Sequence, residues 1–420
     1  MDSFFIVSTS FYNAPKKINT NIILFIFFII AIIFGLYGEC AQRLVSNCLD
    51  TFYELKNGNI KEAISVLKNT NGISTNQLYY HNQLVDINSI KLNLTNTRFV
   101  QKNDSKTVKC ESDMLSMINQ ERFDQERLQS VANRVSELQK KSESVGADFI
   151  YLAVPEKGYY QTFPSNIRDY SKVNFNDYLD CLKENNVPVL SYVDEFKKRN
   201  MDKEDIYYYT DTHWTTNVGF LAAQLACDSI NQRYGIAFDR SKLDIKNYNQ
   251  KLYPDWFLGA LGKKVGTYFT WKGADDFNLI TPKFKTSLIE QKPYEDSVRK
   301  GSFEDTILYG EQIYEKDYYH HDPYSGYCGG NHRLQIFRNQ LENNGKTALF
   351  IRDSFSHVVT PYFALQFKEL HVVDTRGEDI ELYDEKVDWY KYMEELKPDV
   401  VIVLYKGVPY ETMLDFEGKL

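Results

Sequence analysis

Hydrophobic and polar residues divide this chain of 420 residues into three regions. Residues 22–37 form an almost unbroken apolar run. Residues 39–110 are polar and rich in Asn, Thr and Lys, with only short apolar patches. From residue 111 onward, amphipathic stretches alternate with short, continuous apolar runs. The pattern predicts a membrane anchor, a juxtamembrane stalk over 39–110 and one large folded domain over 111–420.

The apolar run matches a membrane-spanning helix better than a signal peptide. A spanning helix needs about 17–25 apolar residues, whereas the apolar part of a signal peptide has about 7–15. Glu39 directly precedes Cys40, which makes this a poor site for cleavage or lipidation. We therefore expect an uncleaved anchor over 21–38. Lys16 and Lys17 place residues 1–20 in the cytoplasm and the large domain outside the cell membrane. A cleaved signal peptide is the alternative.

The third region predicts an α/β domain. Long amphipathic stretches indicate helices, and short apolar runs indicate buried strands. The predicted helices cover 112–144, 175–185, 217–234, 356–367 and 386–396, and the predicted strands cover 148–154, 187–190, 348–351, 370–373 and 400–405. Continuous apolar strands that alternate with helices are typical of a parallel sheet covered on both faces. We therefore predict a three-layer α/β/α fold, with an irregular insertion over about 240–345 that forms a substrate rim.

Charge and cysteine content exclude some classes of function. The formal net charge is −8 and no basic tract is present, which argues against nucleic acid as a partner. The six cysteines permit 15 disulfide pairings and contain no Cys-x-x-Cys pair, so the pairing stays open and a zinc ribbon is disfavoured. His320, His321 and His332 have no carboxylates at a spacing that completes a metal site. We therefore predict no metal and no cofactor.

An acid and an imidazole stand two residues apart in Asp211-Thr212-His213-Trp214. Thr215 or Thr216 is a plausible N-cap for the helix that follows, so the pair lies in the preceding loop. In an extended segment, residues i and i+2 point the same way. Asp211 can then hold one ring nitrogen of His213 and leave the other for a substrate, while Trp214 forms a wall of the site. A solvent-facing loop pair is the alternative.

Ser354 follows the apolar strand predicted over 348–351 and precedes a helix. The carboxyl end of a parallel strand is where such folds place their chemistry, and the N–H groups of a helix start can stabilise an oxyanion. In the alternative, Asp353 or Ser354 only caps the helix. Acyl transfer by a serine needs a hydroxyl, a base and a carboxylate that orients the base. Together the two segments supply Ser354 as nucleophile, His213 as base and Asp211 as the orienting group.

Four segments, in this order along the chain, resemble the alginate O-acetyltransferase-type SGNH hydrolase-like proteins, most closely the DHHW family. The resemblance covers roughly residues 145–420. The segments are Val154-Pro155-Glu156-Lys157 with Phe163-Pro164, Asp211-Thr212-His213-Trp214, Tyr327-Cys328-Gly329-Gly330-Asn331, and Arg352-Asp353-Ser354-Phe355 running to Val372-Val373-Asp374-Thr375-Arg376.

This resemblance implies an SGNH-hydrolase-like α/β/α fold, an Asp–His–Ser triad and transfer of acetyl groups to an extracellular polysaccharide. It implies a multi-pass membrane acyltransferase as the acetyl donor. Around the serine, Asn331 or an N–H of Gly329 or Gly330 would complete the oxyanion site, which Arg352 adjoins. Lys157 would bind a carboxylate or form an ion pair.

Two other functions remain open. An esterase would use the same triad to remove acetyl groups, and a glycan-binding scaffold would have lost catalysis. Arg352, which stands where related enzymes usually have glycine before the serine, is the feature that keeps the scaffold in consideration.

Overall fold

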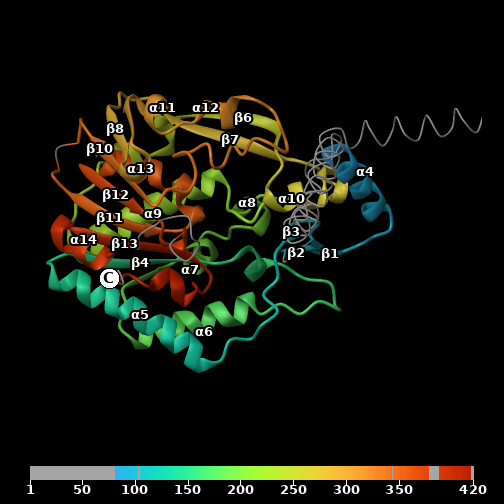
Figure 1. Cartoon of the computed structure of the whole chain (residues 1–420), viewed down its shortest axis with the longest axis horizontal. Coiled ribbons are helices and arrows are strands. Elements are labelled where there is room, and N and C mark those ends of the chain that lie inside the picture. The colour runs from blue at the N-terminus through green and yellow to red at the C-terminus, as the bar shows by residue number, and fades with distance from the viewer. Residues whose placement is uncertain (1–80, 103–104, 343, 378–386, 418–420) are drawn as a thin grey trace, which may run out of the picture. The chain divides into compact units, whose positions relative to one another are not determined.

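The computed structural model describes residues 81–102, 105–342, 344–377 and 387–417 (Figure 1). The predicted anchor over 21–38 and the stalk up to residue 80 lie outside these residues. Among the described residues, no helix combines the length and the apolar character that crossing a membrane requires. One compact unit extends from Asp86 to Leu420. Residues 86–110, which we had assigned to the stalk, therefore belong to the same unit as the predicted catalytic domain.

Five parallel strands, which include the edge strand β5, lie side by side in an eight-stranded sheet with the order β5-β4-β13-β11-β12-β10-β8-β9. They are β4 (Asp148–Val154), β5 (Val189–Ser191), β11 (Thr347–Arg352), β12 (Glu369–Val373) and β13 (Val400–Lys406). Tyr151 on β4 pairs with Val403, which pairs through β11 with Val373 on β12. Strands buried on both faces are apolar along their whole length, so the sequence predicted all five.

The remaining three strands of this sheet correct the prediction of a purely parallel sheet. The insertion contributes β8 (Leu288–Lys292), β9 (Ser297–Gly301) and β10 (Leu334–Asn339), which pair antiparallel to their neighbours. Their buried positions include polar side chains such as Glu290 and Gln335, so they lack a continuous apolar pattern. The insertion also forms a separate antiparallel pair, β6 (Tyr248–Phe257) and β7 (Asp275–Pro282). The sheet is therefore mixed.

Helices cover both faces of the sheet (Figure 1). Side chains alternate along each strand, so that Tyr151 and Ile351 face one side while Leu152 and Phe350 face the other. The first face packs against α5 (Gln125–Ser144), α6 (Ser171–Glu184) and α14 (Trp389–Leu396). The second packs against α7 (Tyr192–Lys198), α9 (Thr216–Tyr234) and α13 (Thr360–Gln366). The predicted three layers are present.

The helix predicted over 112–144 begins later, at Gln125. Asp124 ends the preceding loop because its carboxylate accepts the N–H of Arg127 at 2.8 Å, as an N-cap does. Upstream, β1 (Phe99–Lys102), β2 (Ser105–Lys109) and β3 (Leu115–Ser116) form a small antiparallel sheet. The other helices are α4 (His81–Leu94), α8 (Lys203–Ile206), α10 (Ala260–Val265), α11 (Phe303–Thr306) and α12 (Gly310–Tyr314).

The cysteines of the described residues form no disulfide. Cys110, Cys181, Cys227 and Cys328 are free and buried. They behave as small apolar side chains of the interior. Cys40 and Cys48 lie outside the described residues.

The contact between α9 and the turn after β11 requires a glycine. A Cβ on Gly219 of α9 would lie 2.2 Å from Cγ2 and 2.7 Å from the carbonyl oxygen of Val358, which is part of the short helix η7 (Ser354–Val358). We expect Gly219→Ala to lower the free energy of unfolding by about 1–3 kcal/mol, because the extra methyl group forces α9 and η7 apart. Urea denaturation measures the change. Gln232→Ala, at an exposed position of α9, is the control and should remain within about 0.5 kcal/mol of the native protein. A Gly219→Ala protein as stable as the control would contradict this reading of the contact.

Candidate active site

Ser354 lies just beyond the carboxyl end of β11, at the edge of the sheet where β4 and β13 also end. The preceding residue shapes the turn. The Asp353 carboxylate accepts the N–H of Phe355 at 2.9 Å and, through its other oxygen, the N–H of Lys406 at 2.8 Å. Asp353 therefore caps η7 and ties it to the end of β13, while the Ser354 hydroxyl is left for other partners.

His213 lies in the loop between α8 and α9. Thr215 is the N-cap of α9, because its hydroxyl accepts the N–H of Val218 at 3.4 Å. The Nε2 atom of His213 lies 2.8 Å from Oγ of Ser354, although the two residues are 141 positions apart. Nδ1 of the same ring contacts an oxygen of Asp211. The predicted contact between the imidazole and the hydroxyl is confirmed.

Asp211 is almost completely buried and accepts hydrogen bonds on both oxygens. Oδ1 accepts the N–H of His213 at 2.8 Å and Oδ2 accepts that of Ala260 at 2.6 Å. Burial alone would raise the pKa of Asp211, but the adjacent imidazole and these hydrogen bonds outweigh it and hold the pKa below its usual value. The ionised carboxylate favours a proton on Nδ1 of His213, so Nε2 can accept the proton of Ser354.

Close backbone approach fixes the position of Asp211. A Cβ on Gly259 would lie 2.3 Å from Cβ and 2.6 Å from the backbone nitrogen of Asp211. Only glycine fits between this loop and the start of α10. Gly259 was not singled out in the sequence, because nothing there shows which loop it meets.

Lys157 stabilises the loop that carries Asp211 and His213. Its Nζ donates to the carbonyl groups of Tyr208, Tyr209 (3.0 Å) and Asp211 (2.8 Å). Only 3% of the residue is exposed, and burial lowers the pKa of Lys157 to about 8. The prediction that Lys157 binds a carboxylate or forms an ion pair is wrong. Three carbonyl oxygens occupy its donors, so it stabilises the loop that carries Asp211 and His213.

Asp275 on β7 also stabilises this loop through hydrogen bonds. It was not among the site residues predicted from the sequence. Its carboxylate accepts the N–H of Tyr209 at 2.6 Å and both the N–H (2.8 Å) and the hydroxyl (2.5 Å) of Thr210. The insertion contains many acidic residues, and Asp276 directly follows Asp275, so the sequence gave no signal of this role.

Arginine side chains approach the serine from the opposite side. Arg376 Nη1 lies 3.5 Å from Oγ of Ser354. Arg376 also donates to both oxygens of Asp374, at 2.9 and 2.6 Å, and these bonds raise its pKa against the effect of burial. Arg376 was not among the predicted site residues, although it ends the last of the motif segments. Its position in that motif was the available signal.

The predicted oxyanion residues lie beside this cluster. Oδ1 of Asn331 accepts hydrogen bonds from Arg352 (2.8 Å) and Arg376 (2.7 Å) and lies 3.0 Å from Nε2 of His357. Arg352 is 1% exposed, forms an ion pair with Asp374 at 3.1 Å and donates to the carbonyl of Gly330 at 3.2 Å. Arg352 is therefore a buried side chain that holds Asn331 and Gly330 in position, and it does not reach a substrate.

Trp214 corrects a second prediction. The side chain is fully buried, and its Nε1 donates to the carbonyl of Phe355 at 2.8 Å. Its indole packs edge-on against Tyr192 and Phe355. Trp214 therefore joins the base loop to the turn of the nucleophile from within the core and does not wall the site.

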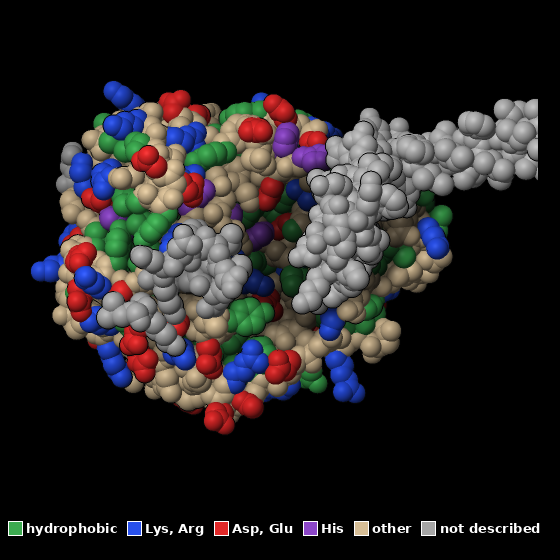
Figure 2. All heavy atoms as spheres, viewed as in Figure 1, with side chains coloured by type: hydrophobic (Ala, Val, Ile, Leu, Met, Phe, Trp, Pro, Cys, Tyr) green, Lys and Arg blue, Asp and Glu red, His purple; other side chains and the backbone are tan. Residues whose placement is uncertain are grey.

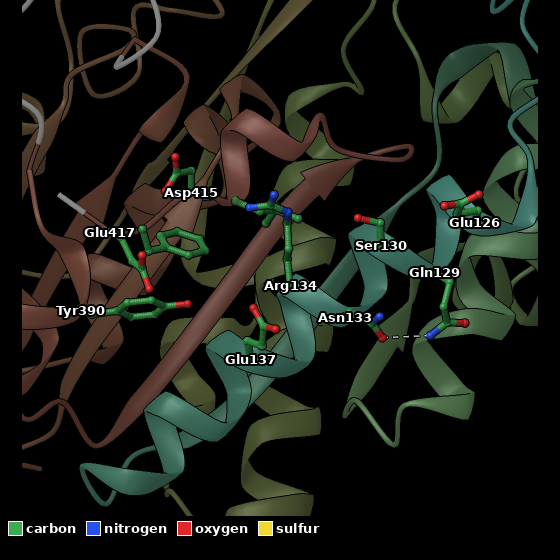
Figure 3. Close-up of a pocket in the computed structure, with 11 residues that line it drawn as sticks. Glu126, Gln129, Ser130, Asn133, Arg134, Glu137, Tyr390, Asp415 and Glu417 are labelled. Atoms are coloured by element: carbon green, nitrogen blue, oxygen red, sulfur yellow. Dashed lines mark hydrogen bonds between the residues drawn. The ribbon is translucent and has the colours of Figure 1, made fainter. Parts of the chain in front are cut away.

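A pocket of about 190 Å³ is lined by sequence neighbours of Asp211, His213 and Ser354, but by none of these three residues. It lies between the loop over 116–123 and the segments that follow β4 and β13, and Thr212 and Phe355 form one side. The rest of its lining includes Met117, Arg127, Glu156, Lys406 and Tyr410. On the face shown in Figure 2, basic and acidic side chains of the described residues are interspersed. A larger groove of about 640 Å³ lies elsewhere, between α5 and the C-terminal segment, and its lining includes Arg134, Glu137, Asp415 and Glu417 (Figure 3). No residue of the triad lines it.

Comparison with known proteins extends this description. Residues 113–262 match the family model of the SGNH hydrolase-like domain of the acetyltransferase AlgX. The match includes Asp211 and His213 and ends before Ser354. No curated protein matches the chain.

Solved structures share the fold. PatB1 of Bacillus cereus with a sulfonyl adduct superposes with a TM-score of 0.60 at 20% identity, over 75% of this chain and 100% of the other. A DHHW family protein from Eubacterium siraeum gives a TM-score of 0.51 at 18% identity, over 75% and 96%. The resemblance inferred from the motifs is therefore confirmed: residues 113–262 match the SGNH hydrolase-like domain of the acetyltransferase AlgX, and the fold is shared with a DHHW family protein.

Proposed function

We propose that this protein is a serine O-acetyltransferase that transfers acetyl groups to hydroxyls of a cell-surface or secreted polysaccharide. The observation that carries the proposal is the 2.8 Å contact between His213 Nε2 and Ser354 Oγ, with Asp211 on the other ring nitrogen. Hydrogen-bond reach between a nucleophile and its base is about 2.6–3.2 Å. The match to an acetyltransferase domain model supports acetyl as the group that is moved.

The reaction has two balanced halves. In the first, Ser354 Oγ bonds to the acetyl carbonyl carbon, its proton passes to Nε2 of His213, and the donor leaves with that proton. In the second, a sugar hydroxyl attacks the acetyl-serine ester and gives its proton to Nε2. The acetyl–Oγ bond breaks and Ser354 recovers its proton. Asp211 stabilises the imidazolium in both halves.

The developing oxyanion has two candidate partners. Because Oδ1 of Asn331 is bound by two arginines and lies within 3.0 Å of His357, the amide N–H groups of Asn331 are left to face outward. Arg376 adds a positive charge near Oγ of Ser354. Preorganised donors of this kind are worth about 2.7–4 kcal/mol each in related chemistry. Gly330 contributes by bringing Asn331 to this position.

Anchoring and acetyl supply complete the proposal. The apolar run over 22–37 would hold the domain at the outer surface of the cell membrane. Acetyl-CoA is not available there, so a multi-pass membrane acyltransferase would deliver the acetyl group to Ser354. The chemistry of an esterase differs only in the second half, where water replaces the sugar hydroxyl.

The triad predicts selective covalent labelling. A sulfonyl fluoride or an active-site serine phosphonate should label the native protein once, at Ser354, and mass spectrometry should locate the adduct. Ser354→Ala should abolish labelling. His213→Ala should slow both labelling and acetyl transfer from para-nitrophenyl acetate by about 10³-fold or more, because the hydroxyl keeps its proton.

Ser356→Ala is the matched control, since its hydroxyl bonds to the carbonyl of Asp353 at 2.8 Å and is not bonded to the base. Unchanged turnover in Ser354→Ala or His213→Ala, with the fold intact by circular dichroism, would remove the triad from the mechanism.

Transfer and hydrolysis differ in the fate of the acetyl group. With para-nitrophenyl acetate as donor, we expect an extracellular-type oligosaccharide to raise the rate of nitrophenol release and to appear as an O-acetylated product by mass spectrometry. Free acetate as the only product, at a rate independent of the oligosaccharides offered, would favour the esterase instead.

The depressed pKa of Asp211 makes a prediction about pH and stability. A carboxyl group whose pKa is lower in the folded than in the unfolded protein stabilises the fold above its unfolded value of about 3.9, and this stabilisation is lost as the pH falls through the folded value. Asp211→Asn should therefore be less stable than the native protein at pH 7, and the difference should narrow below about pH 4. Urea denaturation at several pH values measures it. In addition kcat should fall about 10⁴-fold, because the wrong tautomer of His213 is favoured. A stability difference that widens toward acid would contradict the argument.

A further inference from the structure

Aromatic rings hold the imidazole of His213 on two sides. The ring of Tyr324 stacks on it at 4.4 Å between centroids and an interplanar angle of 19°. The ring of Phe355 lies 4.9 Å away and is tilted by 54°. Only 17% of the His213 side chain is exposed. The ring that must accept a proton is therefore surrounded mainly by aromatic faces and by Asp211.

Tyr324 is itself fixed in place. Its hydroxyl donates to the carbonyl of Phe355 at 3.0 Å, the same oxygen that accepts the indole N–H of Trp214. The turn that carries Tyr324 is tied by Asp322, whose carboxylate accepts the N–H of Tyr324 at 3.1 Å and the hydroxyl of Ser325 at 2.6 Å. The carbonyl oxygen of Phe355, the residue after Ser354, thus accepts hydrogen bonds from two side chains. One is Trp214, which follows His213, and the other is Tyr324, whose ring covers His213.

We propose that Tyr324 is a positioning residue for acyl transfer, which holds the His213 ring in line with Ser354 and stabilises the imidazolium through the face of its own ring. The inference rests on the proposed function. When the proton of Ser354 moves to Nε2, a positive charge forms on a ring with little access to water. The face of an aromatic ring carries partial negative charge and attracts such a cation. The same charge forms again when the acceptor hydroxyl gives up its proton, so Tyr324 assists both halves of the reaction.

Burial raises the pKa of Tyr324 well above its usual value, so the phenol stays neutral and its hydroxyl remains a donor. The stacked ring and the hydroxyl therefore have separate roles: the ring acts on His213, and the hydroxyl fixes the ring. Removing each in turn can distinguish them.

The test compares four variants of the full chain with para-nitrophenyl acetate as substrate. Tyr324→Leu removes the ring, and Tyr324→Met is a second ring-free variant in case the first does not fold. Tyr324→Phe keeps the ring and loses only the hydroxyl. Tyr327→Leu is the matched control, because this tyrosine of the same turn is equally buried and bonds to the backbone of Ile280 at 2.8 Å, with no contact to His213.

The ring-free variants should lower kcat about tenfold while KM stays within about twofold, since the loss concerns charge that exists only in the transition state. Tyr324→Phe should keep at least about a third of the native kcat. Tyr327→Leu should lower the melting temperature without the selective loss of kcat. In a His213→Ala background, Tyr324→Leu should change the residual rate less than twofold, because the residue acts through the imidazole.

Three results would overturn the inference: a native kcat in the ring-free variants, an equal loss of kcat in Tyr327→Leu, or a tenfold loss that persists in the His213→Ala background. Failure of the proposed function is distinguishable, since it would appear as undiminished turnover in Ser354→Ala whatever Tyr324 does.

Discussion

The arrangement of the site depends on the hydrogen bonds that the ammonium group of Lys157 donates. Lys157 follows β4 and reaches the carbonyl groups of three residues in the loop that carries Asp211 and His213. A buried charge is costly, and here three carbonyl groups that accept its hydrogen bonds and the nearby carboxylates of Asp275 and Asp211 compensate it. The loop is thereby bent so that its carbonyl groups point at Lys157 while the side chains of Asp211 and His213 point toward Ser354. A neutral side chain at position 157 would remove the donor of the Tyr208 and Asp211 carbonyl groups, while the carbonyl of Tyr209 would keep the N–H of Leu115 at 2.8 Å.

The insertion, which interrupts the α/β pattern, supplies much of what surrounds the triad. It carries Asp275 and Gly259, which fix the loop of His213, Tyr324, which covers the imidazole, and Asn331, whose side chain accepts hydrogen bonds from Arg352 and Arg376. Three of its strands extend the sheet that contains β11, and Asn331 lies shortly before one of them, β10, whereas Asp275 belongs to the separate pair of β6 and β7. The parallel strands place Ser354, and the insertion places Tyr324 against the ring of His213 at 4.4 Å between centroids.

How far the sequence predicts this structure depends on where the signal lies. The five parallel strands are mostly apolar, so the sequence predicts them, and the end of β11 directs attention to Ser354. The pairing of Ser354 with His213 came from chemical complementarity and from the motif order, and the structure confirms their contact. The three carbonyl groups that bind Lys157 and the close approach of Gly259 to Asp211 are properties of the backbone. The pattern of side chains along the sequence does not reveal them. Trp214 was misplaced because a tryptophan beside a histidine fits a wall and a core equally well in sequence.

Arg352 shows why one departure from the family pattern does not by itself indicate lost function. A side chain in place of the usual glycine would be expected to crowd the turn before the nucleophile. Here the guanidinium instead turns inward, pairs with Asp374 and binds both the side chain of Asn331 and the carbonyl of Gly330. Burial lowers the pKa of Arg352, but its intrinsic value is so high that the group stays charged. Arg352 and Arg376 share the carboxylate of Asp374, and the carboxylate of Asp353 also acts on both guanidinium groups. Arg352 is therefore better explained as a support for Asn331 and Gly330, the residues of the proposed oxyanion site, than as a sign of a scaffold.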